Sequence, residues 1–372
     1  MDACYRLHDT SQVFSPALLF YKELIVKNID LAVRMAGSAS RLRPHAKTHK
    51  TREIVELELQ AGITKHKCAT IAEAEMLASA GAADVFLAYN MVGPNCARLA
   101  ALAKHFPQVR FAVTADDPEA LADLSKALEK AGVSVDVLLD LDVGQHRTGM
   151  MPGAAAERLY ERICSLPAVE PGGFHVYDGH QNQEDPSERK TAVLRSLEPV
   201  LELRAALERR GMPVPRLICG GTPTFPVYAT LDFPGLELAP GTFVLHDSGY
   251  GTRFSDLSGF TPAALLLTRV VSRPTPTRVT MDLGYKALAS DPPAGKRCRL
   301  LDVPAYEAVL QNEEHLVIET PAAGNYRPGD VIYAVPTHVC PTVHVHREAH
   351  VVEGGRITQK WEIVARDRRL TI

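Results

Sequence analysis

The residues from 43 to 50 combine the side chains that amine chemistry requires. They read Arg-Pro-His-Ala-Lys-Thr-His-Lys, so Lys47 lies among other cations and two imidazoles. A lysine that is partly desolvated beside other cations has its ammonium form disfavoured, and its neutral amine can attack a carbonyl to form a Schiff base. We therefore take Lys47 as a candidate catalytic residue. The alternative is a solvated basic loop that binds phosphate or has no ligand.

A candidate anion-binding arginine follows the apolar run from 135 to 142. The run continues into Val-Gly-Gln-His-Arg-Thr-Gly, where Arg147 could hold a phenolic or carboxylate oxygen through its planar guanidinium. A simpler interpretation has Arg147 paired with Asp140 or Asp142 at the end of a strand. Spacing alone leaves both interpretations open.

A candidate phosphate site begins at Gly220 and Gly221, after the apolar residues 217–219. Thr222, Pro223 and Thr224 complete this loop. A double glycine at the end of a strand lets backbone N–H groups turn toward an anion, and threonine hydroxyls add donors. An ordinary glycine turn closed by threonine is the alternative.

A candidate metal-binding pair, His338 and Cys340, lies in the stretch Thr-His-Val-Cys-Pro-Thr at 337–342. On an extended strand, residues i and i+2 point to the same face, so both side chains could reach one cation. Imidazole and thiolate suit Zn²⁺, and two protein ligands leave positions open for water and substrate. Three further histidines could be rival ligands, but we favour exposed strand positions for His344, His346 and His350.

The elements that position these residues alternate between β-type runs and amphipathic helical stretches from about residue 25 to residue 250. Helical periodicity is clear over 71–80 and 95–105. The predicted strands are the Lys47 run, 65–69, 84–89, 109–114, 133–142, 172–177, 216–219 and 236–245. Eight βα units predict a (β/α)8 TIM-type barrel, with its active site at the carboxyl ends of the strands. An open doubly wound sheet is the alternative, but its Gly-rich dinucleotide turn is missing after the first strand.

After residue 250 the helical periodicity largely disappears, and short β-rich runs alternate with Pro, Gly and Asn turns. These runs cover 263–272, 277–283, 315–320, 331–335, 342–352 and 357–365. We therefore predict a C-terminal all-β domain, with its boundary between Tyr250 and Pro262.

Composition narrows the class of function. The 372 residues are 46% hydrophobic and 23% charged, with a formal net charge of −3, so no bulk positive field would attract nucleic acid or an anionic membrane. The seven scattered cysteines indicate reduced thiols rather than a disulfide framework. The first residues lack the basic and apolar segments of a signal peptide. We expect a cytoplasmic protein that acts on a small molecule.

Five stretches together resemble the D-threonine aldolase and D-serine dehydratase family. They are residues 43–50, 146–149, 219–224, 240–242 and 337–342, and they occur in the family's order across nearly the whole chain. Members of this family are pyridoxal phosphate enzymes of the alanine racemase fold type.

The resemblance implies a role for each candidate. Lys47 would form the Schiff base with pyridoxal phosphate, and Arg147 would contact the phenolic oxygen of the cofactor. The other implied contacts are Gly220, Gly221 and Thr222 at the phosphate, Tyr177 near the pyridine nitrogen, and His338 and Cys340 at a divalent metal, with His338 also catalytic.

The resemblance also implies an arrangement of domains. Residues 25–255 would form the barrel that binds pyridoxal phosphate. Residues 1–24 would join 256–372 in the β-strand domain that carries the metal ligands, through a strand at 16–21. A homodimer is expected.

Two reactions fit this family. Cys340 as a ligand resembles the zinc-dependent dehydratase, whereas residues 282–291 resemble the aldolases. We favour retro-aldol cleavage of a D-3-hydroxy-α-amino acid to glycine and an aldehyde, with zinc or manganese. The alternatives are a D-serine or D-3-hydroxy amino acid dehydratase giving a keto acid and ammonia, a racemase, a non-catalytic pyridoxal phosphate-binding protein, and a metabolite-binding barrel without a covalent cofactor.

Overall fold

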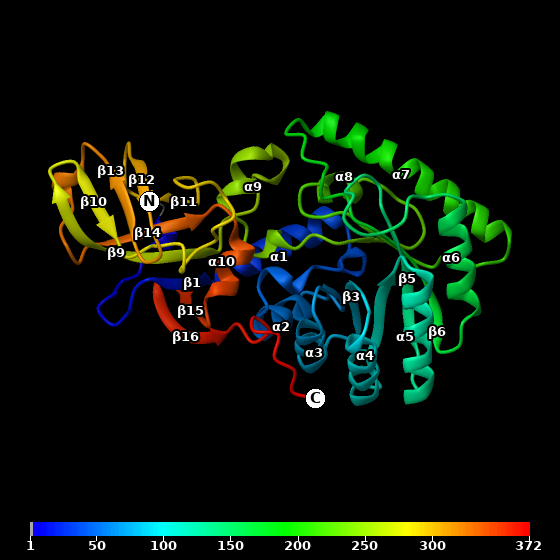
Figure 1. Ribbon diagram of the computed structural model, residues 1–372. Helices are drawn as coiled ribbons and strands as arrows, with labels where there is room; N and C mark the ends of the chain where they lie inside the picture. The colour runs from blue at the N-terminus through cyan, green and yellow to red at the C-terminus, as the bar shows by residue number, and fades with distance from the viewer. Residues whose placement is uncertain (1–2) are drawn as a thin grey trace. The chain divides into compact units, whose positions relative to one another are not determined.

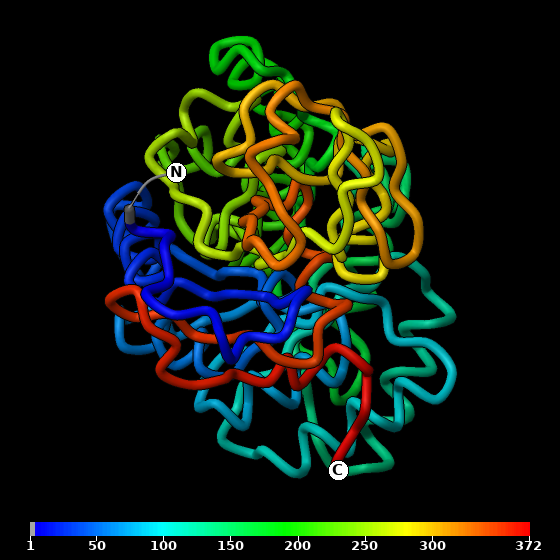
Figure 2. The backbone as a smooth tube through the Cα atoms, turned by 90° about the vertical axis from the view of Figure 1, so that its left-hand side faces the viewer, coloured from blue at the N-terminus to red at the C-terminus, as the bar shows by residue number. Residues whose placement is uncertain are grey.

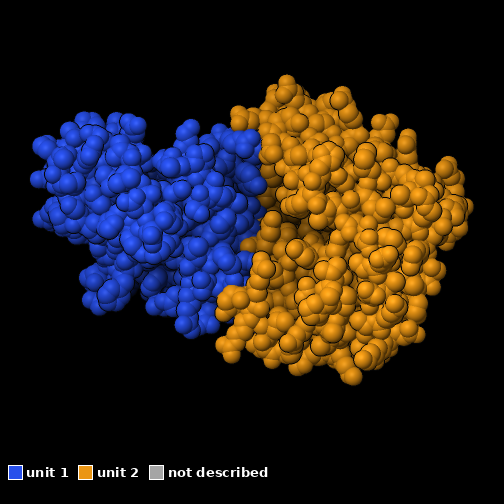
Figure 3. Space-filling model, viewed as in Figure 1, with its two compact units in different colours: residues 1–31, 48–54, 242–366 blue, residues 32–47, 55–241, 367–372 orange. Residues whose placement is uncertain are grey.

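The computed structural model describes residues 3–372, which divide into two compact units (Figure 3). The β unit comprises the chain up to residue 31, residues 48–54 and residues 242–366. The barrel unit comprises 32–47, 55–241 and 367–372. These limits differ from the domain limits of 25–255 and 1–24 plus 256–372, which remain a prediction; residues 1 and 2 lie outside the described part.

The barrel unit is built on a seven-stranded parallel sheet whose strands follow chain order. Residues 42–45 complete the ring, because Leu42 forms a parallel bridge to Leu238 and His45 forms one to Lys67. The predicted barrel is therefore confirmed, with a short bridging segment in place of one strand. The strands are β2 (Lys65–Cys68), β3 (Asp84–Asn90), β4 (Arg110–Ala115), β5 (Val135–Leu141), β6 (Val169–Val176), β7 (Leu217–Cys219) and β8 (Leu236–Leu238).

The run around Lys47 is not a strand, and that part of the prediction was wrong. After the bridge at His45 the chain turns into a 3-10 helix at Ala46–Thr48. Pro44 cannot donate to a neighbouring strand, although its carbonyl accepts from the Lys67 N–H at 2.8 Å. The turn therefore ends the pairing before Lys47 and leaves the Lys47 side chain exposed.

Helices alternate with the barrel strands, and α3, α5 and α6 pack against the sheet (Figure 1). Asp117 and Asp185 cap the amino ends of α5 and α7 through side-chain hydrogen bonds, and each is followed by proline at the first helical position. The helices are α1 (Lys22–Ala36), α2 (Arg52–Gln60), α3 (Ile71–Ser79), α4 (Pro94–His105), α5 (Pro118–Ala131), α6 (Ala154–Ser165), α7 (Pro186–Arg209) and α8 (Phe225–Ala229).

Side chains that alternate along the strands fill the barrel in three layers. The layer at the amino ends is charged and consists of Arg43, Lys65, Asp84, Asp136, Arg216 and Glu237. The middle layer is apolar and consists of Phe86, Ala112, Leu138, Ile218 and Ala239. The layer near the carboxyl ends is polar again and contains Lys67, Thr114, Asp140 and His175.

Ion pairs satisfy the charged layer. The buried guanidinium of Arg43 lies 2.5 Å from Glu237 and 2.8 Å from Asp84. Lys65 lies 2.8 Å from the other oxygen of Glu237, and Arg216 pairs with Asp136. Because each carboxylate has a cation beside it, this layer can be buried without isolated charges.

The β unit contains a nine-stranded sheet in the order β12-β13-β10-β9-β1-β15-β16, with β14 also pairing with β9 and β11 with β14. Strand β1 runs antiparallel to β9 and parallel to β15, so the prediction that residues 16–21 join the C-terminal strands is confirmed (Figures 1 and 2). The strands are β1 (Ala17–Tyr21), β9 (Ala264–Thr275), β10 (Arg278–Met281), β11 (Cys298–Leu300), β12 (Glu307–Gln311), β13 (Leu316–Glu319), β14 (Val331–Pro336), β15 (Glu348–Glu353) and β16 (Arg356–Glu362).

Two predicted strands were wrong in part. The stretch 337–342 is not extended, because helix α10 (Val339–Val345) begins directly after His338. The run 236–245 is a strand only as far as Leu238, and after Pro240 it forms a 3-10 helix at Thr242–Val244. Within residues 3–372, no helix is both long and apolar enough to cross a membrane.

Candidate active site

The carboxyl end of the barrel holds two lysines with different environments. Lys47 is exposed on the turn that follows the bridging segment, and its backbone N–H lies 3.4 Å from Nδ1 of His45. Lys67 is in β2, its side chain is buried at 3% exposure, and its charge interacts with that of Lys47. The structure thus places beside the predicted Lys47 a second amine that was not predicted.

A chain of hydrogen bonds links Lys67 to two neighbouring strands. Nζ of Lys67 lies 2.8 Å from Nε2 of His175 in β6, and Nδ1 of His175 lies 2.7 Å from Oδ1 of Asp140 in β5. Thr148 also donates a side-chain hydrogen bond to Asp140. The three charged or titratable groups are buried and depend on one another for their hydrogen bonds.

Burial governs the electrostatics of this chain. It lowers the pKa of Lys67 to about 7, and the charge of Lys47 acts in the same direction, while Asp140 opposes both. Burial and the charge of Lys67 also lower the pKa of His175. For Asp140, burial favours the neutral acid, but the contact with His175 holds the pKa below its usual value. An uncharged amine is therefore accessible at Lys67 near neutral pH.

Arg147 and Tyr177 contact each other at this end of the barrel. The guanidinium carbon of Arg147 lies 5.0 Å from the ring centroid of Tyr177, a cation–π geometry. The acids considered as partners of Arg147 are engaged elsewhere, because Asp142 contacts His146 at 2.9 Å and Asp140 contacts His175. Since Arg147 is exposed, its guanidinium can receive an anionic oxygen.

The loop after β7, predicted as a phosphate site, is closely packed. Gly220 has φ +75°, and a Cβ there would lie 2.8 Å from the ring of Tyr228. A Cβ on Gly221 would lie 3.2 Å from the Tyr177 ring, so the glycines create space beside that ring. The Gly220 N–H donates to the Val176 carbonyl at 2.9 Å, and this amide is therefore already used. The buried Thr222 accepts from the Gly241 N–H at 3.1 Å.

A buried acid holds this loop in place. Asp178 follows Tyr177 directly and accepts a hydrogen bond from Oγ1 of Thr224 at 2.9 Å. Burial raises the pKa of Asp178 to about 6, although hydrogen bonds from Thr224 and Tyr228 favour its carboxylate. Asp178 thus holds the loop 220–224 in place, and its carboxyl group carries little charge at weakly acidic pH.

Pyridoxal phosphate fits the residues at this end of the barrel. The glycines leave a space that a Cβ would fill, and Lys47 and Arg147 supply exposed cationic side chains for an anionic aldehyde. Asp140 favours the charged form of Lys67, but burial and the charge of Lys47 outweigh it. Such a site favours an anion.

The predicted metal ligands lie in the β unit, at the amino end of α10. His338 precedes the helix and Cys340 is its second residue, and their side chains are hydrogen-bonded to each other. Nδ1 of His338 lies 2.5 Å from Oδ2 of Asp291. Burial opposes the charged imidazole, but the contacts with Cys340 and Asp291 raise the pKa of His338 to about 9.

This donor set fits a divalent metal with open positions. With Nδ1 of His338 bonded to Asp291, Nε2 is the nitrogen left for a metal, and a carboxylate behind a ligating histidine is a common second partner. Sγ of Cys340 lies 3.3 Å from Oγ1 of Thr48. Across residues 3–372, no group of three or more His, Cys, Asp or Glu side chains converges on one point. The pair would thus leave positions for other ligands.

Asp247 positions the helix that carries Cys340. Its Oδ1 accepts from the Tyr250 N–H at 3.0 Å at the start of α9 (Ser248–Arg253), and its Oδ2 accepts from the Val339 N–H at 3.1 Å. One carboxylate therefore caps two helices.

The three histidines that were predicted to be exposed differ in their exposure. His344 is exposed, whereas His346 contacts the Ala287 carbonyl at 2.7 Å and His350 is half-buried.

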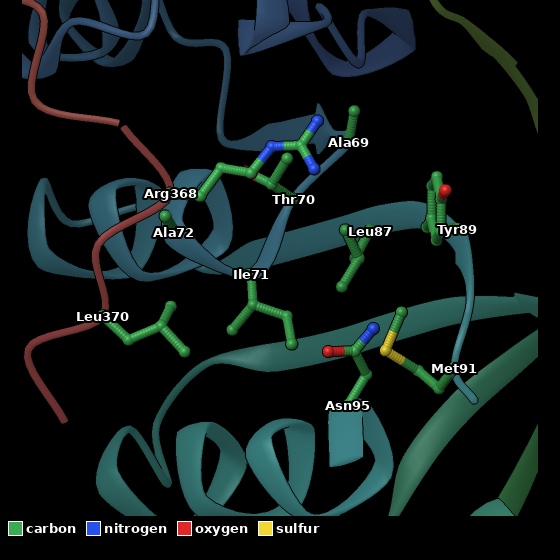
Figure 4. A pocket seen from close by; sticks show the side chains of 10 residues that line it. All are labelled: Ala69, Thr70, Ile71, Ala72, Leu87, Tyr89, Met91, Asn95, Arg368 and Leu370. Atoms are coloured by element: carbon green, nitrogen blue, oxygen red, sulfur yellow. The ribbon is translucent and has the colours of Figure 1, made fainter. Parts of the chain in front are cut away.

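A separate cavity lies on the barrel unit between the C-terminal residues and the starts of α3 and α4 (Figure 4). Its volume is about 230 Å³, and Ile71, Leu87, Tyr89, Asn95 and Arg368 are among the residues that line it. Alternation along β3 turns Leu87 and Tyr89 away from the barrel interior, where Phe86 lies. None of the predicted site residues lines this cavity.

Comparisons with known proteins agree with this fold. Residues 22–244 match the alanine racemase N-terminal domain, and residues 263–352 match the putative serine dehydratase domain. The chain is 31% identical to a D-threonine aldolase of Arthrobacter sp over 87% of this chain and 85% of that protein. It is 28% identical to a 3-hydroxy-D-aspartate aldolase of Paracoccus denitrificans (strain Pd 1222), over 97% and 94% of the two chains.

A solved structure of a related protein has the same fold. The crystal structure of D-threonine aldolase from Filomicrobium marinum superposes with a TM-score of 0.88 at 29% identity, covering 95% of this chain and 96% of that one. The barrel with its lysine and the β unit thus define a protein of the alanine racemase fold class. Within that class, the chain belongs to the D-threonine aldolase and D-serine dehydratase family.

Proposed function

We propose that the protein is a pyridoxal phosphate- and divalent metal-dependent lyase, which cleaves D-3-hydroxy-α-amino acids by a retro-aldol reaction to glycine and an aldehyde. One observation carries this proposal. The same protein has Lys47 at the end of the barrel that holds the buried, hydrogen-bonded residues Lys67, His175 and Asp140. It also has a pair of hydrogen-bonded side chains suited to a metal, His338 and Cys340. The identity of 31% to a D-threonine aldolase supports this choice of reaction.

Five barrel residues would hold the cofactor besides Lys47, which would bind it covalently. Arg147 would receive the phenolic oxygen, and Tyr177, stacked against Arg147, would lie near the pyridine nitrogen. The phosphate would lie against Gly220, Gly221 and Thr222, where the glycines leave space for it, in a loop that Asp178 keeps in place through Thr224. When bound, pyridoxal phosphate delocalises the negative charge that develops at Cα of an amino acid.

His338 and Cys340 would hold the metal, which we propose is zinc or manganese. A divalent ion there would act as a Lewis acid on the β-hydroxyl of the substrate. Asp291 would orient the His338 ring, and Asp247 would fix the start of α10 through the Val339 N–H. We also propose that His338 is catalytic, through the metal that it would hold at the β-hydroxyl of the substrate.

The partners follow from this activity. The substrate is a small D-amino acid, and neither nucleic acid nor a membrane takes part. We propose a homodimer as the assembled form and the cytoplasm as the compartment, because the odd cysteine count fits reduced thiols.

A second candidate function is dehydration of D-serine or a related D-3-hydroxy amino acid to a keto acid and ammonia. The observation that favours it is Cys340, a thiol within contact of His338, since this pair suits zinc. The match of residues 263–352 to the putative serine dehydratase domain supports the same alternative.

One experiment separates these functions. Purified protein loaded with pyridoxal phosphate is incubated with a panel of D-3-hydroxy amino acids, with and without a chelator, and both glycine and keto acid are measured. We expect glycine from D-threonine or a related substrate, and loss of this product with chelator. Pyruvate from D-serine with no glycine from any substrate would overturn the aldolase proposal in favour of the dehydratase. No product from any substrate would favour a non-catalytic cofactor-binding protein.

A further inference from the structure

Lys67 is not among the residues proposed above to hold the cofactor, yet it lies at the same end of the barrel as Lys47. Its side chain is 3% exposed, and its Nζ lies 2.8 Å from Nε2 of His175. The same atom lies 5.5 Å from the ring centroid of Tyr177 and 6.0 Å from that of Phe86. A lysine among aromatic rings, with an imidazole as hydrogen-bond partner, is not held by a carboxylate as a structural lysine would be.

The hydrogen-bond pattern fixes how the chain can hold a proton. A carboxylate can only accept, so Nδ1 of His175 carries the hydrogen that it donates to Asp140. In the neutral imidazole, Nε2 then has a lone pair that accepts from the amine of Lys67. In this tautomer, Nε2 of His175 can accept a hydrogen bond from Lys67 whether the lysine is charged or uncharged. A proton can therefore be added to the amine of Lys67 without rearranging its neighbours.

The charges around Lys67 come from several elements. Lys47 and Arg147 contribute positive charge, and Asp140 in β5 contributes negative charge. Cys219, the last residue of β7, and the more distant Asp178 contribute negative charge only when ionised, and burial raises the pKa of the Cys219 thiol. Burial and the charge of Lys67 lower the pKa of His175. Burial and the charge of Lys47 outweigh Asp140, so that the pKa of Lys67 is lowered to about 7.

An anion bound at Lys47 would reverse this balance. Pyridoxal phosphate carries a phosphate and a phenolic oxygen, and its negative charge near Lys67 would favour the ammonium form as Asp140 does.

We propose that Lys67 is a positioning residue for the cofactor, which takes up a proton when pyridoxal phosphate binds and thereby supplies the positive charge that holds the anionic ring. This inference rests on the proposed function. The proton comes from solvent, forms an N–H bond on Nζ of Lys67, and leaves His175 and Asp140 in their existing protonation states. Lys67 is thus close to neutral in the empty protein at pH 8 and charged in the loaded one.

The test is calorimetric titration of apoprotein with pyridoxal phosphate in buffers of different ionisation enthalpy, which gives the number of protons taken up. Lys67→Met removes the amine, and Lys67→Arg keeps a charge that does not titrate. We expect wild type at pH 8 to take up about one proton more than either variant, and this difference to disappear at pH 6, where Lys67 is already protonated. Protons exchanged by Lys47 are common to all three proteins and cancel in the comparison.

Lys65→Met is the matched control, because Lys65 also faces the barrel interior from β2 but is paired with Glu237 at 2.8 Å. It should keep the wild-type proton uptake. Circular dichroism checks folding, and Lys67→Arg carries the test if Lys67→Met does not fold. Proton uptake at pH 8 that is unchanged in Lys67→Arg would overturn the inference and leave the proposed function intact. Absence of pyridoxal phosphate binding by wild type would overturn the proposed function and this inference with it.

Discussion

Lys67 and His175 share a hydrogen bond of 2.8 Å across the interior of the barrel, from β2 to β6. The bond places an amine where the barrel would otherwise hold an apolar side chain, directly above the layer formed by Phe86, Ala112, Leu138, Ile218 and Ala239. Lys47, which we propose as the covalent site, is exposed by contrast. The site therefore combines an exposed amine with a buried one, and the two can be tested independently.

Replacement of Lys47 by alanine should abolish the visible absorbance that develops when pyridoxal phosphate binds covalently. The physical reason is that the exposed amine is removed, while the buried Lys67 remains bonded to His175. The measurement is an absorbance spectrum after excess cofactor has been removed by gel filtration. Lys104→Ala in the last turn of α4 is the surface control and should keep the band. A band of unchanged intensity in Lys47→Ala would show that another amine is the covalent site.

Replacement of Cys340 by alanine should remove bound zinc, because one of the two ligands that we propose is lost. Asp291→Asn should weaken zinc binding by about 10- to 100-fold, the usual effect of losing the partner of a ligating histidine. Metal content is measured after dialysis against buffered zinc. Cys298→Ala is a matched control, since Cys298 is a half-buried thiol of the same unit. Equal zinc in the Cys340 and Cys298 variants would contradict the metal assignment.

Replacement of Gly220 by alanine should harm the protein more than the same change at Gly211. The two glycines have nearly equal φ, +75° and +76°, so the backbone cost of about 1–2 kcal/mol is shared. Only Gly220 has a neighbour within the reach of a Cβ, the Tyr228 ring at 2.8 Å, which should add about 1–3 kcal/mol. Urea unfolding and cofactor titration measure the two effects. Similar losses in both variants would show that the loop is not tightly packed.

Acid should destabilise the barrel through its charged layer. Burial favours the neutral acids, but the guanidinium of Arg43 holds the pKa of Asp84 and of Glu237 below their ordinary values of 3.8 and 4.5. Because the folded pKa values are depressed, this stability is fully present above about pH 4.5 and is lost as pH falls through the folded values. Urea unfolding at pH 7, 5, 4 and 3 measures the loss.

Arg43→Met supplies the contrast for this acid effect. The variant should lose about 3–5 kcal/mol near neutral pH, since one buried oxygen of Glu237 and one of Asp84 lose their partner, and should lose less than wild type on further acidification. Arg110→Met should cost less than about 1 kcal/mol, because Arg110 is 56% exposed although it also contacts a carboxylate of this layer, that of Asp136. A parallel pH profile in wild type and Arg43→Met would contradict the role of Arg43.

Much of the barrel could be predicted because its signals are local. Runs of apolar residues between helical periods predicted β3 to β7, and strand ends located Arg147 and the glycine loop. Lys67 lay inside a predicted strand, but its burial depends on which face of β2 turns inward. The signal that could have revealed it is the pair Lys65 and Lys67, which share one face of a strand in a barrel interior.

The start of α10 could not be predicted from the alternation of side chains along an extended strand. His338 and Cys340 were placed on one face of a strand, and they do come together, but through a helix start. Pro341 carried the missed signal, because proline favours the first turn of a helix. Asp247, which caps this helix through the Val339 N–H, lies 92 positions away from Val339 in the sequence. This cap therefore depends on tertiary structure alone.

The position of β1 has a consequence for biosynthesis. Its neighbours in the sheet are β9, which begins at Ala264, and β15, which begins at Glu348. During synthesis the ribosome therefore releases the whole barrel before the first of these partners exists, and the apolar strand Ala17–Tyr21 must wait with both edges unpaired. Until β9 and β15 emerge, the apolar strand Ala17–Tyr21 has no partner in its sheet, so the interval in which it is open to aggregation falls early in synthesis rather than late.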